Sequence, residues 1–359
     1  MLQSIRSLRG VAALLVVIYH ACEYARTHGH ADMANTFLFG AFGVDLFFVI
    51  SGYVMLLALE KIITSPQSAS HLTIDFLARR LIRIAPIYWI GTVFLYTIYA
   101  IQPEKFKAFS ATFEMFARSM LFLPIDRGAG KSTISPILSQ GWTLYHEFFF
   151  YAVLSTLLAF NIRQKLKYAT PALVAAITIL GCILITDTRQ PWIELITSPI
   201  NMEFSLGCIV YTLRRPKGSA LALITAASSC AVAMVFLQLA PELSKVRDAT
   251  RTIYWGMPAA LIFYAAICLE RQIALFSDKF NKFAGDPSYS IYIFHGLIFS
   301  GLDIFIKKTG INGNSTAFVA MLTLGAAVIS NFIYRAIEMP LTRKLNSIWS
   351  LEFNVRPAR

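Results

Sequence analysis

The stretch RSLRGVAALLVVIYH, residues 6–20, is an apolar run with a cation near one end and an imidazole at the other. In an α-helix each residue turns about 100° and rises about 1.5 Å, so the eleven steps from Arg9 to His20 make about three full turns and span about 16 Å. The two side chains therefore share one face of the predicted helix. This geometry is typical of a lining that reaches from a membrane surface into the interior of a protein.

The whole chain has the composition of a membrane protein. Its 359 residues are 56% hydrophobic and 14% charged, whereas soluble domains contain about 25% charged residues. The net charge of +12 is also found in nucleic-acid-binding proteins. Here the charges stand mostly at the ends of apolar runs, so we interpret the basic excess as membrane topology and expect no nucleic-acid partner.

Ten apolar stretches are predicted to cross the membrane as helices. They lie near residues 8–26, 38–59, 80–101, 141–160, 170–186, 198–213, 219–239, 253–270, 287–306 and 316–337. The shorter apolar stretch 112–124 carries Glu114 and Arg118, and it is predicted to be a lipid-facing or re-entrant part of a long loop.

Topology and domain organisation follow from the basic residues. With both termini in the cytoplasm, most of the 32 lysines and arginines fall on the cytoplasmic side, as the positive-inside rule requires. The fold is therefore predicted to be all-α, a polytopic membrane domain over residues 1–345 followed by a short basic cytoplasmic tail, 346–359.

Four ionisable side chains are predicted to lie at one depth, roughly 8–10 Å below the outer membrane surface. They are His20, Asp45, Glu147 and Glu203. Such groups are costly in lipid, by about 2.5–3.5 kcal/mol for Asp, Lys or Arg at mid-helix, and usually face a cavity or each other. We expect them to line one polar chamber. The alternative is a structural role, in which His20 is a hydrogen-bonded core histidine and the acids pair with buried cations.

A second polar group is expected at the cytoplasmic surface. The segment RRLIRIAPIYW, residues 79–89, places Arg80 and Arg83 three positions apart on one helical face. With Arg9 they would form a site for phosphates, because guanidinium groups match phosphate oxygens. The alternative is ordinary positive-inside anchoring. His295 is expected near mid-membrane.

An imidazole beside carboxylates can act as a general base on a hydroxyl group. The residues alone equally allow a proton-coupled transporter that uses the same groups as a relay. A scaffold in which they only assist assembly is a third alternative, which the spacing of Arg9 and His20 disfavours. The chain lacks the phosphate-binding, dinucleotide-binding, zinc-protease and serine-hydrolase motifs. We expect no metal cofactor.

Several motifs, taken together, resemble one family. IRSLRGVAALLVVIYHA (residues 5–21) is similar to the first helix of the acyltransferase-3 family of integral membrane O-acyltransferases. The other matching motifs follow in that family's order: FGVDLFFVISGYVM (42–55), RRLIRIAPIYW (79–89), WTLYHEFFFY (142–151), YSIYIFH (289–295) and IEMP (337–340). The single-module form is most similar to the exopolysaccharide acetyltransferases of the succinoglycan type.

The resemblance implies roles for particular residues. It makes Arg9 and His20 an essential pair, and it makes Arg80 and Arg83 the Arg-x-x-Arg element that meets acyl-CoA. Glu147 matches the acid of a Trp-Ser-Leu-x-x-Glu-type motif in which this chain has Thr143 in place of Ser. Some relatives carry an added esterase-like domain, so either this membrane module finishes the reaction or a separate partner does.

The resemblance also implies the reaction. Members transfer acyl groups, commonly acetyl from acetyl-CoA, to extracytoplasmic or lipid-linked glycans such as exopolysaccharide or O-antigen, in the bacterial inner membrane. We expect His20 either to deprotonate the acceptor hydroxyl or to relay the acyl group, and we expect the arginines to bind the donor. The remaining expected site residues are Asp45 and Glu147 as catalytic partners, and Trp142, Glu203 and His295 as substrate-binding groups. The expected partners are acyl-CoA, a glycan, the bilayer and proteins of polysaccharide biosynthesis.

Overall fold

The computed structural model describes residues 2–33, 36–103, 111–125, 135–185, 190–213, 228, 249–309 and 314–353. Every regular element within these ranges is helical, which confirms the predicted all-α class there. The α-helices are α1 (Gln3–Thr27), α2 (Phe42–Ile63), α3 (Ala69–Ile101), α4 (Phe113–Met120), α5 (Trp142–Ala159), α6 (Leu166–Leu184), α7 (Pro191–Thr197), α8 (Met202–Leu213), α10 (Ala249–Arg251), α11 (Met257–Cys268), α12 (Glu270–Phe276), α13 (Asp278–Phe280), α14 (Ser288–Thr309), α15 (Ser315–Ile333) and α16 (Met339–Glu352).

Three π-helical segments interrupt these helices: η7 (Thr252–Gly256), η8 (Asn281–Gly285) and η9 (Tyr334–Glu338). Such segments are rare and often lie at functional sites. Each of the three borders one of the polar clusters described below.

Among the described residues, six helices are long and apolar enough to cross a membrane, and the number is seven if the bent pair Pro191–Thr197 and Pro199–Leu213 crosses as one unit. This supports a multi-pass membrane protein. The count of ten spans and the cytoplasmic position of the termini stay predictions. The predicted span 219–239 lies outside the described residues, and α11 with the preceding π-helix (Thr252–Cys268) is a shorter apolar helix.

The stretch 112–124 contains only the eight-residue helix α4. At about 1.5 Å per residue, eight residues cover roughly 12 Å, well short of the roughly 30 Å hydrocarbon core. The helix is tied to α3 because the Trp89 indole Nε1 donates a hydrogen bond of 2.7 Å to the carbonyl of Met120. A helix of this length is too short to cross the bilayer, and the lipid-facing or re-entrant placement of the stretch stays a prediction.

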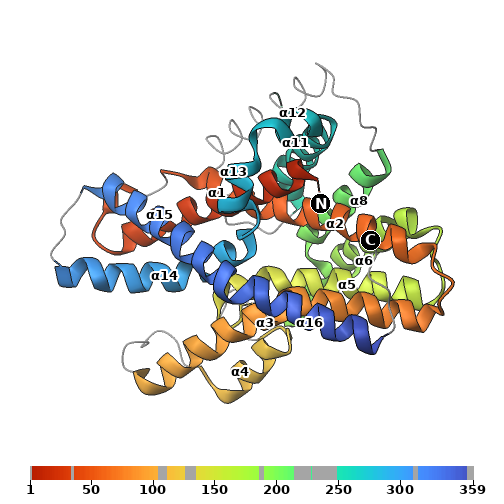
Figure 1. Cartoon of the computed structure of the whole chain (residues 1–359), viewed down its shortest axis with the longest axis horizontal. Helices are drawn as coiled ribbons and strands as arrows, with labels where there is room; N and C mark the ends of the chain where they lie inside the picture. The colour runs from red at the N-terminus through yellow and green to blue at the C-terminus, as the bar shows by residue number, and fades with distance from the viewer. Residues whose placement is uncertain are drawn as a thin grey trace.

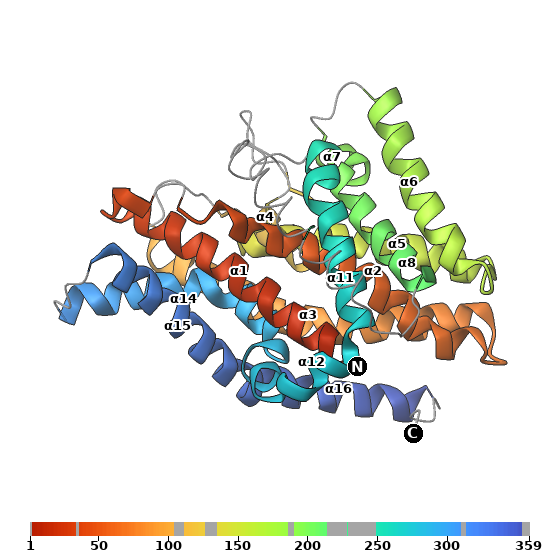
Figure 2. The same ribbon diagram turned by 90° about the horizontal axis from the view of Figure 1, so that it is seen from above.

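Helix α1 lies at the centre of the arrangement. It packs against α2 on one side and against α14 and α15 on the other, as Figure 2 shows. Helix α8 packs between α2 and α6, and α5 joins α3 to α6. The N-terminal helix therefore contacts elements from both ends of the sequence.

Two helices are longer than a bilayer requires. Helix α3 has 33 residues, and the run Ser315–Leu351 has 37, so each extends roughly 50 Å or more. In Figure 1 α16 runs beside α3. The Trp349 indole donates a hydrogen bond of 2.8 Å to Asp75, and the Phe353 ring packs on His71. The first turns of α3, which precede its arginines, thus pack against the end of α16.

The tightest helix contact joins α2 and α8 at two glycines. A Cβ atom on Gly52 would collide with the Phe204 carbonyl oxygen, and one on Gly207 would collide with the Val49 carbonyl oxygen. Small residues allow this approach, and in lipid such packing is a main source of helix association. The contact holds α2 in place, and α2 carries residues that line the first cavity described below as well as the buried Asp45.

Candidate active site

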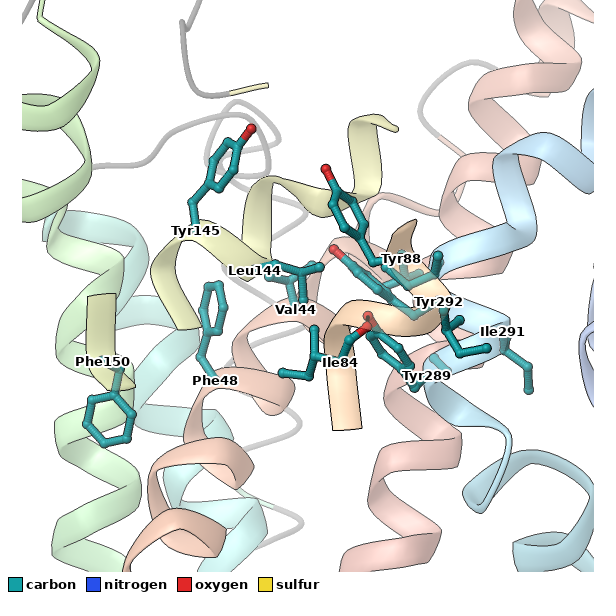
Figure 3. Close-up of a cluster of buried hydrophobic side chains, with 14 of the residues drawn as sticks. Val44, Phe48, Ile84, Tyr88, Leu144, Tyr145, Phe150, Tyr289, Ile291 and Tyr292 are labelled. Carbon is teal, nitrogen blue, oxygen red and sulfur yellow. Dashed lines mark hydrogen bonds between the residues drawn. The ribbon is translucent and has the colours of Figure 1, made fainter. Parts of the chain in front are cut away.

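A cavity of about 410 Å³ lies among α2, α3, α5 and α14, beside the first turns of α1. Arg9, Arg80 and Arg83 line it together, as the sequence predicted. We call it the arginine cavity. Its apolar wall is formed by side chains from four helices, which Figure 3 shows. The wall residues shown there include Val44, Phe48, Ile84, Leu144, Tyr289 and Tyr292.

The three guanidinium groups are only partly neutralised. Arg83 forms an ion pair of 3.3 Å with Glu338, and Arg9 donates a hydrogen bond of 3.3 Å to the Ser288 hydroxyl. Nε of Arg80 has no hydrogen-bond partner in the described part of the chain. A cavity that brings three cations together, one with an unused donor, is suited to a multiply charged anion.

Glu147 lines the arginine cavity as well, which corrects its predicted place beside His20. Its Oε1 accepts hydrogen bonds from the Tyr151 hydroxyl at 2.5 Å and from the Ser51 hydroxyl at 2.9 Å. Its charge and that of Arg9 lie close enough to interact. Depth along α5 was counted from the sequence, but the direction of the side chain depends on how α5 packs against α2 and α3.

A second cavity, of about 450 Å³, lies beside the last turns of α1. We call it the histidine cavity because His20 and His295 line it. The rest of its lining mixes aromatic with polar groups: Tyr24, Trp142, Tyr292, Phe299, Glu23, Arg26, Thr27, Ser135, Ser139 and Gln140, together with Gly296. Aromatic faces with hydroxyl and amide groups suit a polar ligand that has apolar faces, such as a sugar.

His20 is held by a neighbour that the sequence reasoning missed. Its Nδ1 lies 3.1 Å from Glu23 Oε2, and Glu23 Oε1 accepts a hydrogen bond of 3.0 Å from the Tyr19 hydroxyl. A carboxylate can only accept, so Nδ1 of His20 carries the hydrogen and Nε2 is left for the cavity. This is the base-and-orienter arrangement of nucleophilic and acid–base sites. The spacing of three residues on one helix was the available signal.

His295 is fully buried and lies on α14, opposite His20. Its Nδ1 donates a hydrogen bond of 2.7 Å to the Tyr292 carbonyl oxygen. The two imidazole rings stack, with centroids 5.2 Å apart and planes inclined by 18°. The structure therefore brings together His20, His295 and Trp142, three of the nine predicted site residues.

Tyr292 lines both cavities. Its ring meets Phe47 edge-on at 5.5 Å on the arginine side, and its carbonyl oxygen holds His295 on the other. On α5, Trp142 faces the histidine cavity while Thr143 and Leu144 face the arginine cavity. The two cavities thus meet at Tyr292 and the first turn of α5, and two members of the predicted chamber are divided between them, His20 in one and Glu147 in the other.

Asp45 and Glu203 line neither cavity, which corrects their predicted place beside His20. Both are fully buried. Asp45 accepts two hydrogen bonds, at 3.0 and 2.8 Å, from the guanidinium group of Arg251, which also lies over the Trp255 ring. Glu203 packs against Gly256 in the same cluster. Arg251 was overlooked because it precedes the predicted span 253–270, and nothing local shows that it reaches α2.

Within the described ranges, no group of three or more His, Cys, Asp or Glu side chains has the arrangement of a metal site. The groups that line the two cavities include imidazole, carboxylate and guanidinium groups. General-base catalysis beside an anion site is the simplest use of that set.

Comparisons with known proteins identify the family of this chain. A family model described as an acyltransferase domain matches residues 2–335. The exopolysaccharide production protein ExoZ of Rhizobium meliloti (strain 1021) is 28% identical over 328 residues, covering 91% of this chain and 95% of that protein. Nodulation protein 10 of Rhizobium leguminosarum bv. viciae is 26% identical, with 81% of each chain covered.

No solved structure matches the chain. The family match extends over nearly all of it and includes every residue that lines the two cavities. This chain belongs to that acyltransferase family and is an acyltransferase.

Proposed function

We propose that this protein is a membrane O-acyltransferase that takes an acyl group, acetyl in the first instance, from acyl-CoA and transfers it to a glycan hydroxyl. The donor binds in the arginine cavity and the acceptor in the histidine cavity. The observation that carries the proposal is that Arg9 and His20, on one face of α1, open into these two different cavities.

The donor assignment rests on charge. Coenzyme A carries phosphate groups at one end and the thioester at the end of a long flexible arm. Arg9, Arg80 and Arg83 provide guanidinium forks for phosphate oxygens. The apolar wall that includes Val44 and Leu144 suits the arm, and it leads towards Tyr292.

The acceptor assignment rests on the lining of the histidine cavity. Trp142, Tyr24 and Phe299 offer ring faces, and Gln140 offers an amide group, which together suit a sugar. The relative named exopolysaccharide production protein supports a polysaccharide or its lipid-linked precursor as the acceptor. O-antigen is an alternative glycan of the same kind.

The proposed step is a direct acyl transfer. His20 Nε2 accepts the proton of the acceptor hydroxyl, the hydroxyl oxygen bonds to the acyl carbon, and the carbon–sulfur bond breaks. The proton then passes to the coenzyme A thiolate. Glu23 orients the ring of His20 and stabilises its charged form.

Glu147 has a different role in this proposal. Because it stands among the arginines and not beside His20, it balances their charge and positions Ser51 and Tyr151. The topology that suits the reaction has the first turn of α1 in the cytoplasm of a bacterial cell, with α1 crossing the inner membrane. The donor then binds from the cytoplasm and the glycan is acylated on the far side.

The test is acyl transfer by a His20→Ala variant. Protein in lipid nanodiscs is supplied with acetyl-CoA and with polysaccharide from a strain that lacks the gene. We expect wild-type protein to release coenzyme A and to add acetyl groups detected by mass spectrometry, and His20→Ala to do neither. Full transfer by a folded His20→Ala variant contradicts the proposed role of His20. Proton-coupled solute flux by the same protein in sealed vesicles, without acyl transfer, contradicts the proposed function altogether.

A further inference from the structure

One ring nitrogen of His295, Nε2, has no hydrogen-bond partner among the described residues. Because a carbonyl oxygen can only accept, the 2.7 Å contact with Tyr292 shows that Nδ1 carries the hydrogen. Nε2 of the neutral ring then has a free lone pair. That atom is buried and has no hydrogen-bond partner in the described part of the chain. An unpaired buried acceptor is costly, so a donor from outside the protein is the natural partner.

His20 also has a ring nitrogen that can accept a hydrogen bond. Its Nδ1 is engaged by Glu23, so its Nε2 is also an acceptor while the ring is neutral. The two rings stack, and a lone pair lies in the plane of its ring, so the two Nε2 atoms cannot satisfy each other. The histidine cavity thus presents two imidazole acceptors, on rings whose centroids are 5.2 Å apart.

Two acceptors need two donors. A hydroxyl group carries one hydrogen, so an acceptor alcohol with a single hydroxyl would leave one nitrogen unpaired. A molecule with two hydroxyls on neighbouring carbons can satisfy both. A sugar ring has this property, and the aromatic side chains of the same cavity suit its faces.

We propose that the histidine cavity recognises a pair of adjacent hydroxyl groups, with one bound to His20 and acylated, and the other donating to Nε2 of His295. This rests on the function proposed above. His20 takes the proton because Glu23 compensates the charge that forms. His295 stays neutral, since a second positive charge 5.2 Å from the ring of His20 is unfavourable in a buried site. The acceptor is therefore a sugar with a free hydroxyl beside the one that is acylated.

The test compares acceptors and variants in one assay. Oligosaccharides are prepared from the acceptor polysaccharide, and the hydroxyl that wild-type protein acetylates is located by NMR. Matched oligosaccharides that lack either one of its neighbouring hydroxyls are then compared. For wild-type protein we expect kcat/KM to fall about tenfold to a hundredfold for one of the deoxy acceptors, through the loss of one hydrogen bond in a buried site.

The variants assign that preference to His295. His295→Phe keeps a ring against His20 but has no acceptor, so the intact and deoxy oligosaccharides should become equally good. His295→Gln returns an acceptor atom near the position of Nε2 and should restore part of the preference. Ile304→Ala, on the exposed side of the same helix, is the matched control and should keep the wild-type preference.

The outcomes separate this inference from the proposed function. Acyl transfer with no dependence on either neighbouring hydroxyl, or a preference that survives in His295→Phe, overturns the inference and leaves the function standing. If His295→Phe does not fold, the absence of any preference in the wild-type protein still overturns the inference. No transfer to any glycan by wild-type protein overturns the function.

Discussion

Arg9 and His20 lie on one face of α1 but line two different cavities, which meet at Tyr292. Eleven residues of helix separate the two side chains by about 16 Å along its axis. The helix therefore connects a cationic cavity at its start with an imidazole at its far end. A reaction that needs an anionic donor and a hydroxylic acceptor on opposite sides of a membrane can use this arrangement.

The first prediction concerns the donor. Replacing Arg80 or Arg83 by Gln should weaken coenzyme A binding about tenfold to a hundredfold, because hydrogen bonds to charged groups contribute about 1.5–3 kcal/mol. The affinity of wild-type protein should also fall with rising salt, since salt screens the attraction between the phosphates and the guanidinium groups. Isothermal titration of coenzyme A into nanodiscs measures both.

Arg79→Gln is the matched control for this prediction. Arg79 lies on the same helix, pairs with Asp75 at 2.9 Å and does not line the cavity. Its loss should leave coenzyme A affinity unchanged. Equal affinity in wild-type, Arg80→Gln and Arg83→Gln proteins would show that the phosphates bind elsewhere.

The second prediction concerns Glu23. Glu23→Gln removes the charge that orients His20 and stabilises its protonated form, so kcat for acyl transfer should fall by at least about tenfold, within the range that general-base catalysis contributes. Coenzyme A affinity should not change, because Glu23 lies in the other cavity. Tyr19→Phe, which removes only a hydrogen bond to the carboxylate, should have a smaller effect. A wild-type kcat in Glu23→Gln would exclude this positioning role.

The third prediction separates structural acids from catalytic ones. Arg251→Met leaves Asp45 buried without its cation and should cost about 3–5 kcal/mol of stability, which is typical of a broken buried ion pair. Asp45→Asn should cost less, because Glu203 is close enough to attract Arg251. Thermal unfolding in detergent shows which of the two variants loses more stability.

Asp278→Asn serves as the control, since its pair with Lys282 is exposed and such pairs contribute little. One result would contradict the structural role assigned to Asp45. If Asp45→Asn unfolds at the wild-type temperature but transfers no acyl groups, Asp45 has a chemical role after all.

The fourth prediction concerns the contact between α2 and α8. Gly207→Ala places a methyl group against the Val49 carbonyl and should lower the unfolding temperature by pushing the helices apart. Gly301→Ala meets nothing within 4 Å, and it should be neutral or stabilising because alanine favours a helix over glycine by about 0.5–1 kcal/mol. Equal unfolding temperatures for the two variants would show that the close approach of α2 and α8 does not contribute to stability.

Much of this arrangement is predictable from local spacing. The common face of Arg9 and His20, and that of Arg80 and Arg83, follow from helical periodicity alone. The stretch 112–124 is also recognisable as too short and too polar for a span. These features depend on one helix at a time, and the structure has them as predicted.

Features that depend on two or more helices are not predictable in this way. Asp45, Glu147 and Glu203 were placed in one chamber because they were expected at a similar depth. Depth can be counted along a helix, but the direction of a side chain is set by the packing of its neighbours. Asp45 instead faces Arg251, which is 206 residues away, and Glu147 faces the arginines.

The most direct test of the whole account is a sided transfer measurement. Protein is reconstituted in vesicles with a single orientation, which is established from an N-terminal tag. Radiolabelled acetyl-CoA is supplied on the face where α1 begins, and glycan on the opposite face. The account predicts labelled glycan in this arrangement and none when donor and acceptor are exchanged. Transfer that requires both substrates on the His20 face, with no labelled glycan from donor on the Arg9 face, would contradict it.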